Sequence, residues 1–77
     1  MNGHIITFGR HAATIMTDDG YQYYAPFQNI APRVMRELKY PFRSIMVEFQ
    51  VDKTHWSGMT NYGPRYVVYD VDFQYAF

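Results

Sequence analysis

One stretch decides the fold of this 77-residue chain: Ile45-Met46-Val47-Glu48-Phe49-Gln50-Val51-Asp52. Its two sets of side chains alternate, and a period of two is typical of a β-strand with one buried face. The face expected to be buried carries Ile45, Val47, Phe49 and Val51, and the opposite face carries Met46, Glu48, Gln50 and Asp52. The stretch therefore predicts a sheet that covers a hydrophobic core.

Three β-rich segments precede this strand, at residues 3–8, 12–17 and 21–25. Gly9-Arg10 separates the first two, and Pro26 closes the third. Asp18-Asp19-Gly20 predicts a hairpin turn between the second and the third, because Gly adopts positive φ freely and Asp side chains hold turns. The N-terminal third is therefore expected to form a three-stranded meander.

The segment between the third and fourth strands breaks this rhythm. Pro32 suits the first turn of a short helix over residues 32–40, which Pro41 would end. Its apolar face would carry Val34, Met35 and Leu38. A helix of about nine residues is marginal unless it is packed, so a loop with one helical turn is the alternative.

The C-terminal part is interpreted as a polar loop over residues 53–64 and a last strand over residues 65–77. Val67, Tyr69, Val71 and Phe73 are expected on one face of that strand, with Val68, Asp70 and Asp72 on the other. At about 3.3 Å per residue it would span roughly 40 Å, so we expect a bend or a C-terminal extension over residues 73–77. Together the segments predict an all-β fold, a small five-stranded OB-type barrel in a single domain.

Composition excludes several classes of protein. The chain has no Cys, which excludes disulfides, thiolate catalysis and cysteine zinc sites. Seven Lys and Arg balance seven Asp and Glu, so the chain is not a strongly basic nucleic-acid coat. No apolar run approaches the roughly 20 residues that cross a bilayer. We therefore expect a soluble cytoplasmic domain without a membrane partner, whose many aromatic residues supply much of the core.

The order of these landmarks resembles that of the cold-shock domain over about residues 3–72. Gly3-His4-Ile5-Ile6-Thr7-Phe8 is similar to Gly-x-Val-Lys-Trp-Phe in that family, and Ile15-Met16-Thr17-Asp18-Asp19-Gly20 to Ile-x-x-Asp-Asp-Gly. Tyr23-Tyr24-Ala25-Pro26-Phe27-Gln28-Asn29-Ile30 is similar to Val-Phe-Val-His-Phe-Ser-Ala-Ile, residues 45–51 to Val-Val-Ser-Phe-Glu-Val, and Gly63-Pro64 to a Gly-Pro before the last strand. The resemblance implies an OB-fold that binds single-stranded RNA or DNA, with aromatic rings on strands one to three and cations at the rim.

The chain departs from the family at several of the stacking positions that the resemblance implies. Non-aromatic residues stand there at Thr7, Ala12, Thr14 and Pro26, whereas Phe8, Tyr24 and Phe27 are retained. A base–aromatic stack contributes roughly 1–3 kcal/mol, so the loss of three or four would remove most of the affinity expected of the family.

A locally basic segment follows the third strand. Its cations are Arg33, Arg36, Lys39 and Arg43, opposed by Glu37 alone and interleaved with Tyr40 and Phe42. Cations beside aromatic rings suit single-stranded nucleic acid, and they suit an acidic protein surface as well. The alternative is a solvated helix face with Tyr40 and Phe42 buried.

Two further aromatic features remain open. Trp56 lies in the predicted 53–64 loop, where it would either contact a ligand or partner or fold back over one end of the barrel. The rings of Phe73, Tyr75 and Phe77 would pack on the chain's own barrel, pair with a second copy as a homodimer through the C-terminal strand, or add a strand to a partner's sheet.

Nothing in the sequence favours catalysis. His4, His11 and His55 lack the spacing of metal ligands, and no phosphate-binding loop or nucleophile motif is present. We therefore expect no enzyme activity, no metal and no cofactor.

These patterns predict a cold-shock-like protein that binds single-stranded nucleic acid, RNA above all, by stacking and phosphate contacts. The residues assigned to binding are Phe8, Arg10, Tyr24, Phe27, Arg33, Arg36, Lys39, Tyr40, Arg43 and Trp56. The alternative is a protein-binding module that kept the fold but lost nucleic acid binding. Such a module would act as a small adaptor or inhibitor of a host protein, as accessory proteins of phages and mobile elements do.

Overall fold

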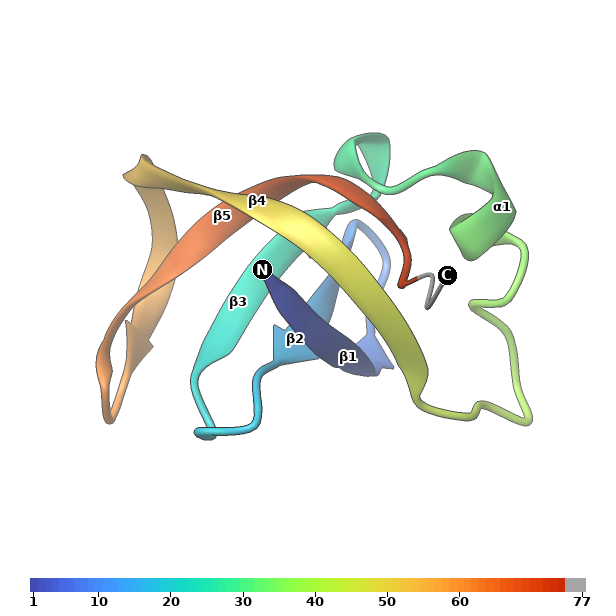
Figure 1. Cartoon of the computed structure of the whole chain (residues 1–77), viewed down its shortest axis with the longest axis horizontal. Helices are drawn as coiled ribbons and strands as arrows, with labels where there is room; N and C mark the ends of the chain where they lie inside the picture. The colour runs from blue at the N-terminus through green and yellow to red at the C-terminus, as the bar shows by residue number, and fades with distance from the viewer. Residues whose placement is uncertain (75–77) are drawn as a thin grey trace.

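A computed structural model of the chain describes residues 1–74, and every structural statement below refers to these residues. The elements in chain order are β1 (Asn2–Phe8), β2 (Ala12–Met16), β3 (Gln22–Pro26), the 3-10 turn η1 (Phe27–Asn29), α1 (Pro32–Met35), β4 (Ile45–Thr60) and β5 (Gly63–Phe73). Figure 1 shows the strands wrapped around one another, with α1 at one end of the long axis and the turn between β4 and β5 at the other.

The five strands form one closed sheet in the order β1-β2-β3-β5-β4, and β4 pairs again with β1. All neighbours are antiparallel except β3 and β5, which run parallel and meet at the pair Tyr24–Val67. The closing pair β1–β4 runs from Asn2 opposite Glu48 to Ile5 opposite Ile45. The prediction of an all-β, five-stranded fold is therefore confirmed at this level.

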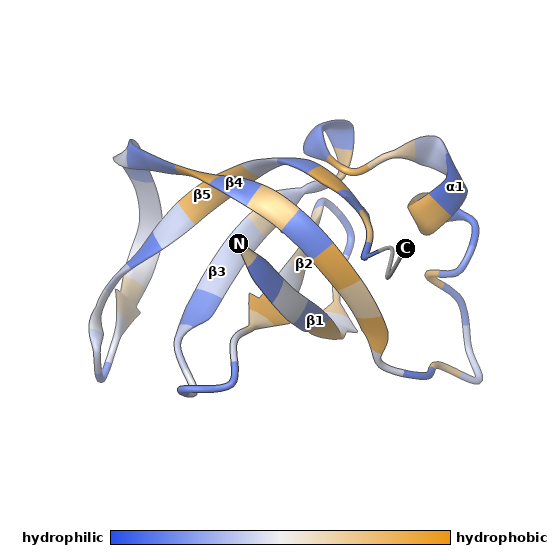
Figure 2. Ribbon diagram, viewed as in Figure 1, coloured by the Kyte–Doolittle hydropathy of each residue, from blue (hydrophilic) through white to orange (hydrophobic). Residues whose placement is uncertain are grey.

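The core follows from the alternation in the strands. In β4 the side chains of Val47 and Phe49 are 0% and 1% exposed, while Met46, Glu48 and Gln50 between and beside them face solvent. Apolar and polar bands accordingly alternate along this strand in Figure 2. Further fully buried side chains come from β1, β2, β5 and α1, and these are Ile5, Ile15, Val34, Val68 and Val71.

The predicted turn between the second and third strands is confirmed. Gly20 adopts a φ of 86° and its N–H donates to the Thr17 carbonyl at 2.9 Å. The Asp19 carboxylate accepts hydrogen bonds from the Thr17 hydroxyl and from the Tyr21 N–H. These bonds, the one from Thr17 first, lower the pKa of Asp19.

Of the two alternatives for residues 32–40, the structure contains the single helical turn. α1 ends at Met35, and single turns follow it, in which the N–H groups of Glu37 and Leu38 donate to the carbonyls of Val34 and Met35. Val34 is its one fully buried residue, and Met35 and Leu38 pack partly buried against the core.

The predicted polar loop over residues 53–64 is wrong. β4 continues through it to Thr60, and a two-residue turn at Asn61-Tyr62 leads directly into β5. Backbone pairing of Trp56 with Tyr66 and of Thr60 with Gly63 holds this part extended. The polar composition suggested a loop, because alternation of apolar and polar residues is expected only where one face of a strand is buried. This two-stranded ribbon is exposed to solvent on both faces, so its residues need not alternate.

The prediction that Val67, Tyr69, Val71 and Phe73 share one face of the last strand is wrong, because Val71 and Phe73 pack inward whereas Val68 takes the inward position in the first half of the strand. The buried side chains are Val68 and Val71, three positions apart, and Tyr69 is 43% exposed. Between the pairs Glu48–Asp72 and Gln50–Tyr69, β4 has one residue and β5 has two, and one of these two, Asp70, adopts a φ of 52°. This β-bulge shifts the inward phase by one residue. The strand ends at Phe73, and the predicted contacts of Tyr75 and Phe77 lie outside the described residues.

Among residues 1–74, no helix has the length and apolar character needed to cross a membrane.

Candidate functional site

The loop from Arg36 to Ser44 folds back onto the end of β1. The Tyr40 ring stacks on Phe8, with centroids 5.2 Å apart and planes 25° from parallel, and Phe42 meets Phe8 edge-on at 5.2 Å. Phe8 and Phe42 also pack against the core. Tyr40 is nevertheless 75% exposed, so one face of its ring is held by Phe8 and much of the rest is open to solvent. The alternative in which Tyr40 is buried is therefore wrong.

Three exposed cationic residues lie close to Tyr40 and Phe42 in the sequence. Arg36, Lys39 and Arg43 have no carboxylate within ion-pair distance in the part of the chain that the structure describes. We call Arg36, Lys39, Tyr40 and Arg43 the basic loop surface. Its three cations outnumber the one nearby carboxylate, that of Glu37, and a net positive charge of this kind attracts a polyanion.

Arg33 is separate from this surface. Its Nε and Nη2 donate to the two oxygens of Asp72 at 2.7 and 2.6 Å, a bidentate pair that joins α1 to the end of β5. The hydrogen bond from Arg33 is the main reason why the pKa of Asp72 lies below its ordinary value. Arg33 therefore has a structural partner, and we assign it no contact with a ligand.

The outer face of β1, β2 and β3 carries one aromatic ring. Thr7, Thr14 and Tyr24 are cross-strand neighbours on this face. The guanidinium of Arg65 lies 5.1 Å from the centre of the Tyr24 ring, and its Nε donates to the Ser57 carbonyl at 2.8 Å. Tyr24 is thus partly covered by a cation–π contact that the sequence did not indicate, because Arg65 becomes its neighbour only through the parallel β3–β5 pair.

Two other predicted residues lie near the connection between β1 and β2. Phe27 packs against the core, and its N–H donates to the His11 carbonyl at 2.9 Å. Arg10 is exposed in that connection. Phe8 and Phe27 both have a packing role, so neither presents a free ring for stacking.

The hairpin arm, residues 53–62, projects at the opposite end of the molecule from α1 (Figure 1). Three extra residues of β4 separate the pair Asp52–Val67 from the pair Trp56–Tyr66. Trp56 is 59% exposed, and Met59 and Tyr62 are also exposed. The alternative in which Trp56 folds back over the end of the barrel is wrong, and Trp56 does not share a surface with the basic loop.

The base of the arm is held by a small polar cluster. Asp52 accepts hydrogen bonds from the Thr54 N–H at 2.9 Å and from the Thr54 hydroxyl, and its second oxygen lies 2.8 Å from Nδ1 of His55. These contacts, those from Thr54 first, lower the pKa of Asp52 to about 2. At the tip, the Tyr62 ring lies 6.4 Å from that of Tyr21.

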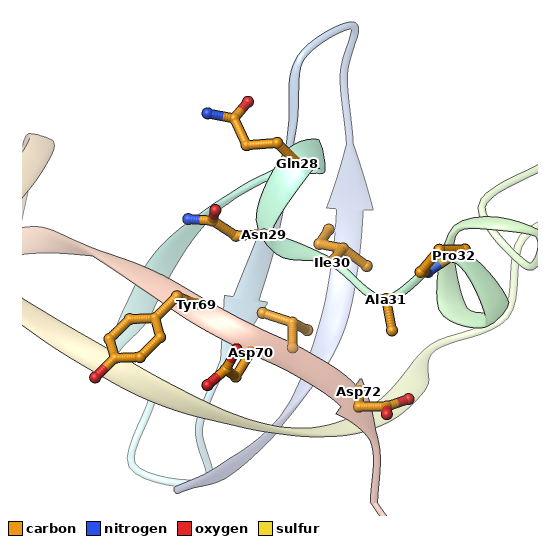
Figure 3. Close-up of a pocket in the computed structure, with 9 residues that line it drawn as sticks. Gln28, Asn29, Ile30, Ala31, Pro32, Tyr69, Asp70 and Asp72 are labelled. Atoms are coloured by element: carbon orange, nitrogen blue, oxygen red, sulfur yellow. The ribbon is translucent and has the colours of Figure 1, made fainter.

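A groove of about 490 Å³ runs between η1 and β5. Figure 3 shows Asn29 and Asp70 on its two sides. Asn29 Nδ2 donates to the Val68 carbonyl at 3.0 Å, and the Ala31 N–H donates to the Val71 carbonyl at 2.8 Å, so β5 and the segment before α1 are firmly joined. The sequence did not indicate this groove, because the bulge at Asp70 shapes it.

In residues 1–74 there is no group of three or more His, Asp or Glu side chains that could hold a metal ion. Compared with protein-family models, with curated proteins and with solved structures, the chain matches none.

Proposed function

We propose that the protein binds single-stranded nucleic acid, RNA in the first place, through the basic loop surface. The interaction consists of stacking on Tyr40 and phosphate contacts from Arg36, Lys39 and Arg43, with no catalytic step. We further propose that the closed sheet is a cold-shock-like OB barrel. The strand order β1-β2-β3-β5-β4 and the parallel β3–β5 contact support this assignment.

The observation that carries the proposal is the combination of an open aromatic ring with a net positive charge. Tyr40 is already stacked on Phe8, so a base that stacks on its free face meets a ring whose orientation is fixed. Pre-ordering of this kind lowers the entropic cost of binding. The three cations without ion-pair partners can neutralise neighbouring phosphates and release counterions.

The interface that we propose is centred away from the sheet face that the resemblance implies, and the composition of that face supports this. There, Thr7 and Thr14 replace aromatics, and Arg65 covers part of the remaining ring of Tyr24. The basic loop supplies what this face has lost, a stacking ring with cations close to it in the chain.

The test is fluorescence anisotropy with a labelled oligo-U of 12 nucleotides, because Trp56 lies too far from the basic loop to report on it. Tyr40→Ala removes a stack of about 1–3 kcal/mol and should weaken binding roughly 5- to 150-fold. Tyr40→Phe should bind as the wild type does. The matched control is Tyr62→Ala, which removes a similarly exposed tyrosine from the opposite end of the molecule.

Salt dependence tests the phosphate contacts separately. Replacing Lys39 and Arg43 by Gln should reduce the slope of log K against log salt by about 0.7 for each cation lost. The proposal fails if the wild type binds neither oligo-U nor oligo-dT at a salt concentration of about 50 mM. It also fails if Tyr40→Ala and Tyr62→Ala bind oligo-U equally well.

One observation favours a second function, a protein-binding module. Trp56, Met59 and Tyr62 are exposed together on the projecting arm, and Trp, Tyr and Met are enriched in protein interfaces. If this is correct, a nuclease-treated host lysate contains a protein that the wild type retains and the double variant Trp56→Ala, Met59→Ala does not. Retention of the same proteins by both forms would argue against it. A homodimer through the C-terminal strand stays a prediction.

A further inference from the structure

A groove of about 350 Å³ lies beside the basic loop, where the loop meets the beginning of β4 and the end of β5. The residues that line it are Glu37, Lys39, Pro41, Arg43, Ser44, Ile45 and Phe73. Two of them, Lys39 and Pro41, are the chain neighbours of Tyr40. The groove is therefore lined by the residues on both sides of the proposed stacking ring in the chain.

The lining combines three kinds of chemistry. Ile45 and Phe73, both partly buried against the core, supply an apolar floor together with Pro41. Lys39 and Arg43 supply positive charge. The single acceptor with negative charge is the carboxylate of Glu37, which has no ion-pair partner in residues 1–74.

A nucleotide is a ligand whose apolar, anionic and hydrogen-bonding parts complement these three parts of the groove. Its base is flat and largely apolar on both faces, its phosphate is an anion, and its base edge carries hydrogen-bond donors and acceptors. A base on the apolar floor would place its phosphate with Lys39 or Arg43 and leave its edge for Glu37. A carboxylate only accepts hydrogen bonds, so it favours an edge that donates them.

Resting on the function proposed above, we infer that this groove holds one nucleotide next to the base on Tyr40, and that Glu37 selects a base with an exocyclic amino group. Cytosine presents such an amino group, from which a carboxylate accepts well. Uracil presents a carbonyl oxygen at the same position, and this oxygen repels the carboxylate. Cytosine is therefore preferred to uracil at this subsite.

The experiment compares labelled oligo-C and oligo-U of equal length by anisotropy at neutral pH and constant salt. The wild type should bind oligo-C roughly tenfold more tightly, as expected for one discriminating contact. Glu37→Gln should bring the two affinities together, mainly by strengthening oligo-U, because an amide can donate to the uracil oxygen. The control is Glu48→Gln, which removes the same charge from the exposed face of β4 and should leave the ratio unchanged.

The outcomes separate the inference from the proposed function. Equal binding of both oligonucleotides by the wild type, or a preference that survives in Glu37→Gln, would overturn the inference while the proposed function stands. If neither oligonucleotide binds, both fail. Displacement of both by an acidic peptide of equal charge at equal concentration would assign the groove to a protein partner and would also overturn the inference. Thermal unfolding of each variant confirms that the compared proteins are folded.

Discussion

The substitution Gly3→Ala adds one methyl group to β1 and tests directly how closely β1 packs in the closed sheet. Gly3 lies in β1 opposite Val47 of β4 and is buried against β2. A Cβ at Gly3 would lie 2.8 Å from the backbone oxygen of Met16 and 2.9 Å from Cγ2 of Ile15. Real Cβ atoms essentially never approach other atoms this closely, so Gly3→Ala must push β1 away from β2.

The size of the effect follows from the kind of contact. Overpacking of this kind costs typically about 1–3 kcal/mol, and the cost belongs near the upper end because the carbonyl oxygen of Met16 is backbone and cannot rotate away. An unfolding entropy of about 2.1 cal/mol/K per residue gives about 0.16 kcal/mol/K for 77 residues. The thermal midpoint should therefore fall by roughly 6–18 °C.

The assay is thermal unfolding followed by circular dichroism, with Gly9→Ala as the matched control. Gly9 is exposed, its φ is not in the left-handed region, and no atom lies within 4 Å of its ideal Cβ. At such a site the substitution stabilises by about 0.4–1 kcal/mol, because it restricts the unfolded chain. If Gly3→Ala unfolds at the same temperature as Gly9→Ala, the close approach of Gly3 to Met16 and Ile15 is refuted.

Three further predictions concern the bulge, the core and the base of the arm. Asp70→Val should lower the free energy of unfolding by about 1–2 kcal/mol, because a β-branched residue fits poorly at a φ of 52°, whereas Asp70→Gly should not; urea midpoints distinguish them. Phe49→Ala should lower the free energy of unfolding by about 3–5 kcal/mol, which is much of the roughly 4–12 kcal/mol of total stability expected for a chain of this size. Equal urea midpoints for the variant and the wild type would contradict the placement of this ring in the core. Because the pKa of Asp52 is lowered from 3.8 to about 2, its contribution to stability is complete above pH 3.8 and is lost as the pH falls to about 2. The difference in thermal midpoint between wild type and Asp52→Asn should therefore shrink over that interval, and a constant difference would count against the Asp52–Thr54 contacts.

Local patterns in the sequence predict most of the strands. The alternation from Ile45 to Val51 is found in the structure, because Val47 and Phe49 are buried whichever strands lie beside this one. The turn at Asp18-Asp19-Gly20 survives because the positive φ of Gly20 and the acceptor oxygens of Asp19 are local properties. Both features depend on residues that are close in the chain.

Features that depend on distant partners could not be predicted in this way. The side chains of β5 that point inward change at Asp70, because one residue of β4 lies opposite two of β5, and only the strand pairing reveals this. Arg33 looked like one of four equivalent cations, yet its partner Asp72 lies 39 positions away. For Tyr40 and Trp56 the sequence left open whether the rings are exposed. The structure exposes both, and the closed topology places the loop of Tyr40 and the arm of Trp56 at opposite ends of the molecule.

The pairing of β1 with β4 also constrains how the protein can be made. The Met1 backbone is hydrogen bonded to Phe49, 48 positions along the chain, and β5 fills the gap between β3 and β4. During synthesis on the ribosome, β1, β2 and β3 emerge as a ribbon whose two outer edges have no neighbours until residues 45–73 have followed. Unpaired edges invite association with other chains, and contacts of such long sequence separation form slowly. The nascent chain is therefore most prone to associate with other chains before β4 and β5 have paired with β1 and β3.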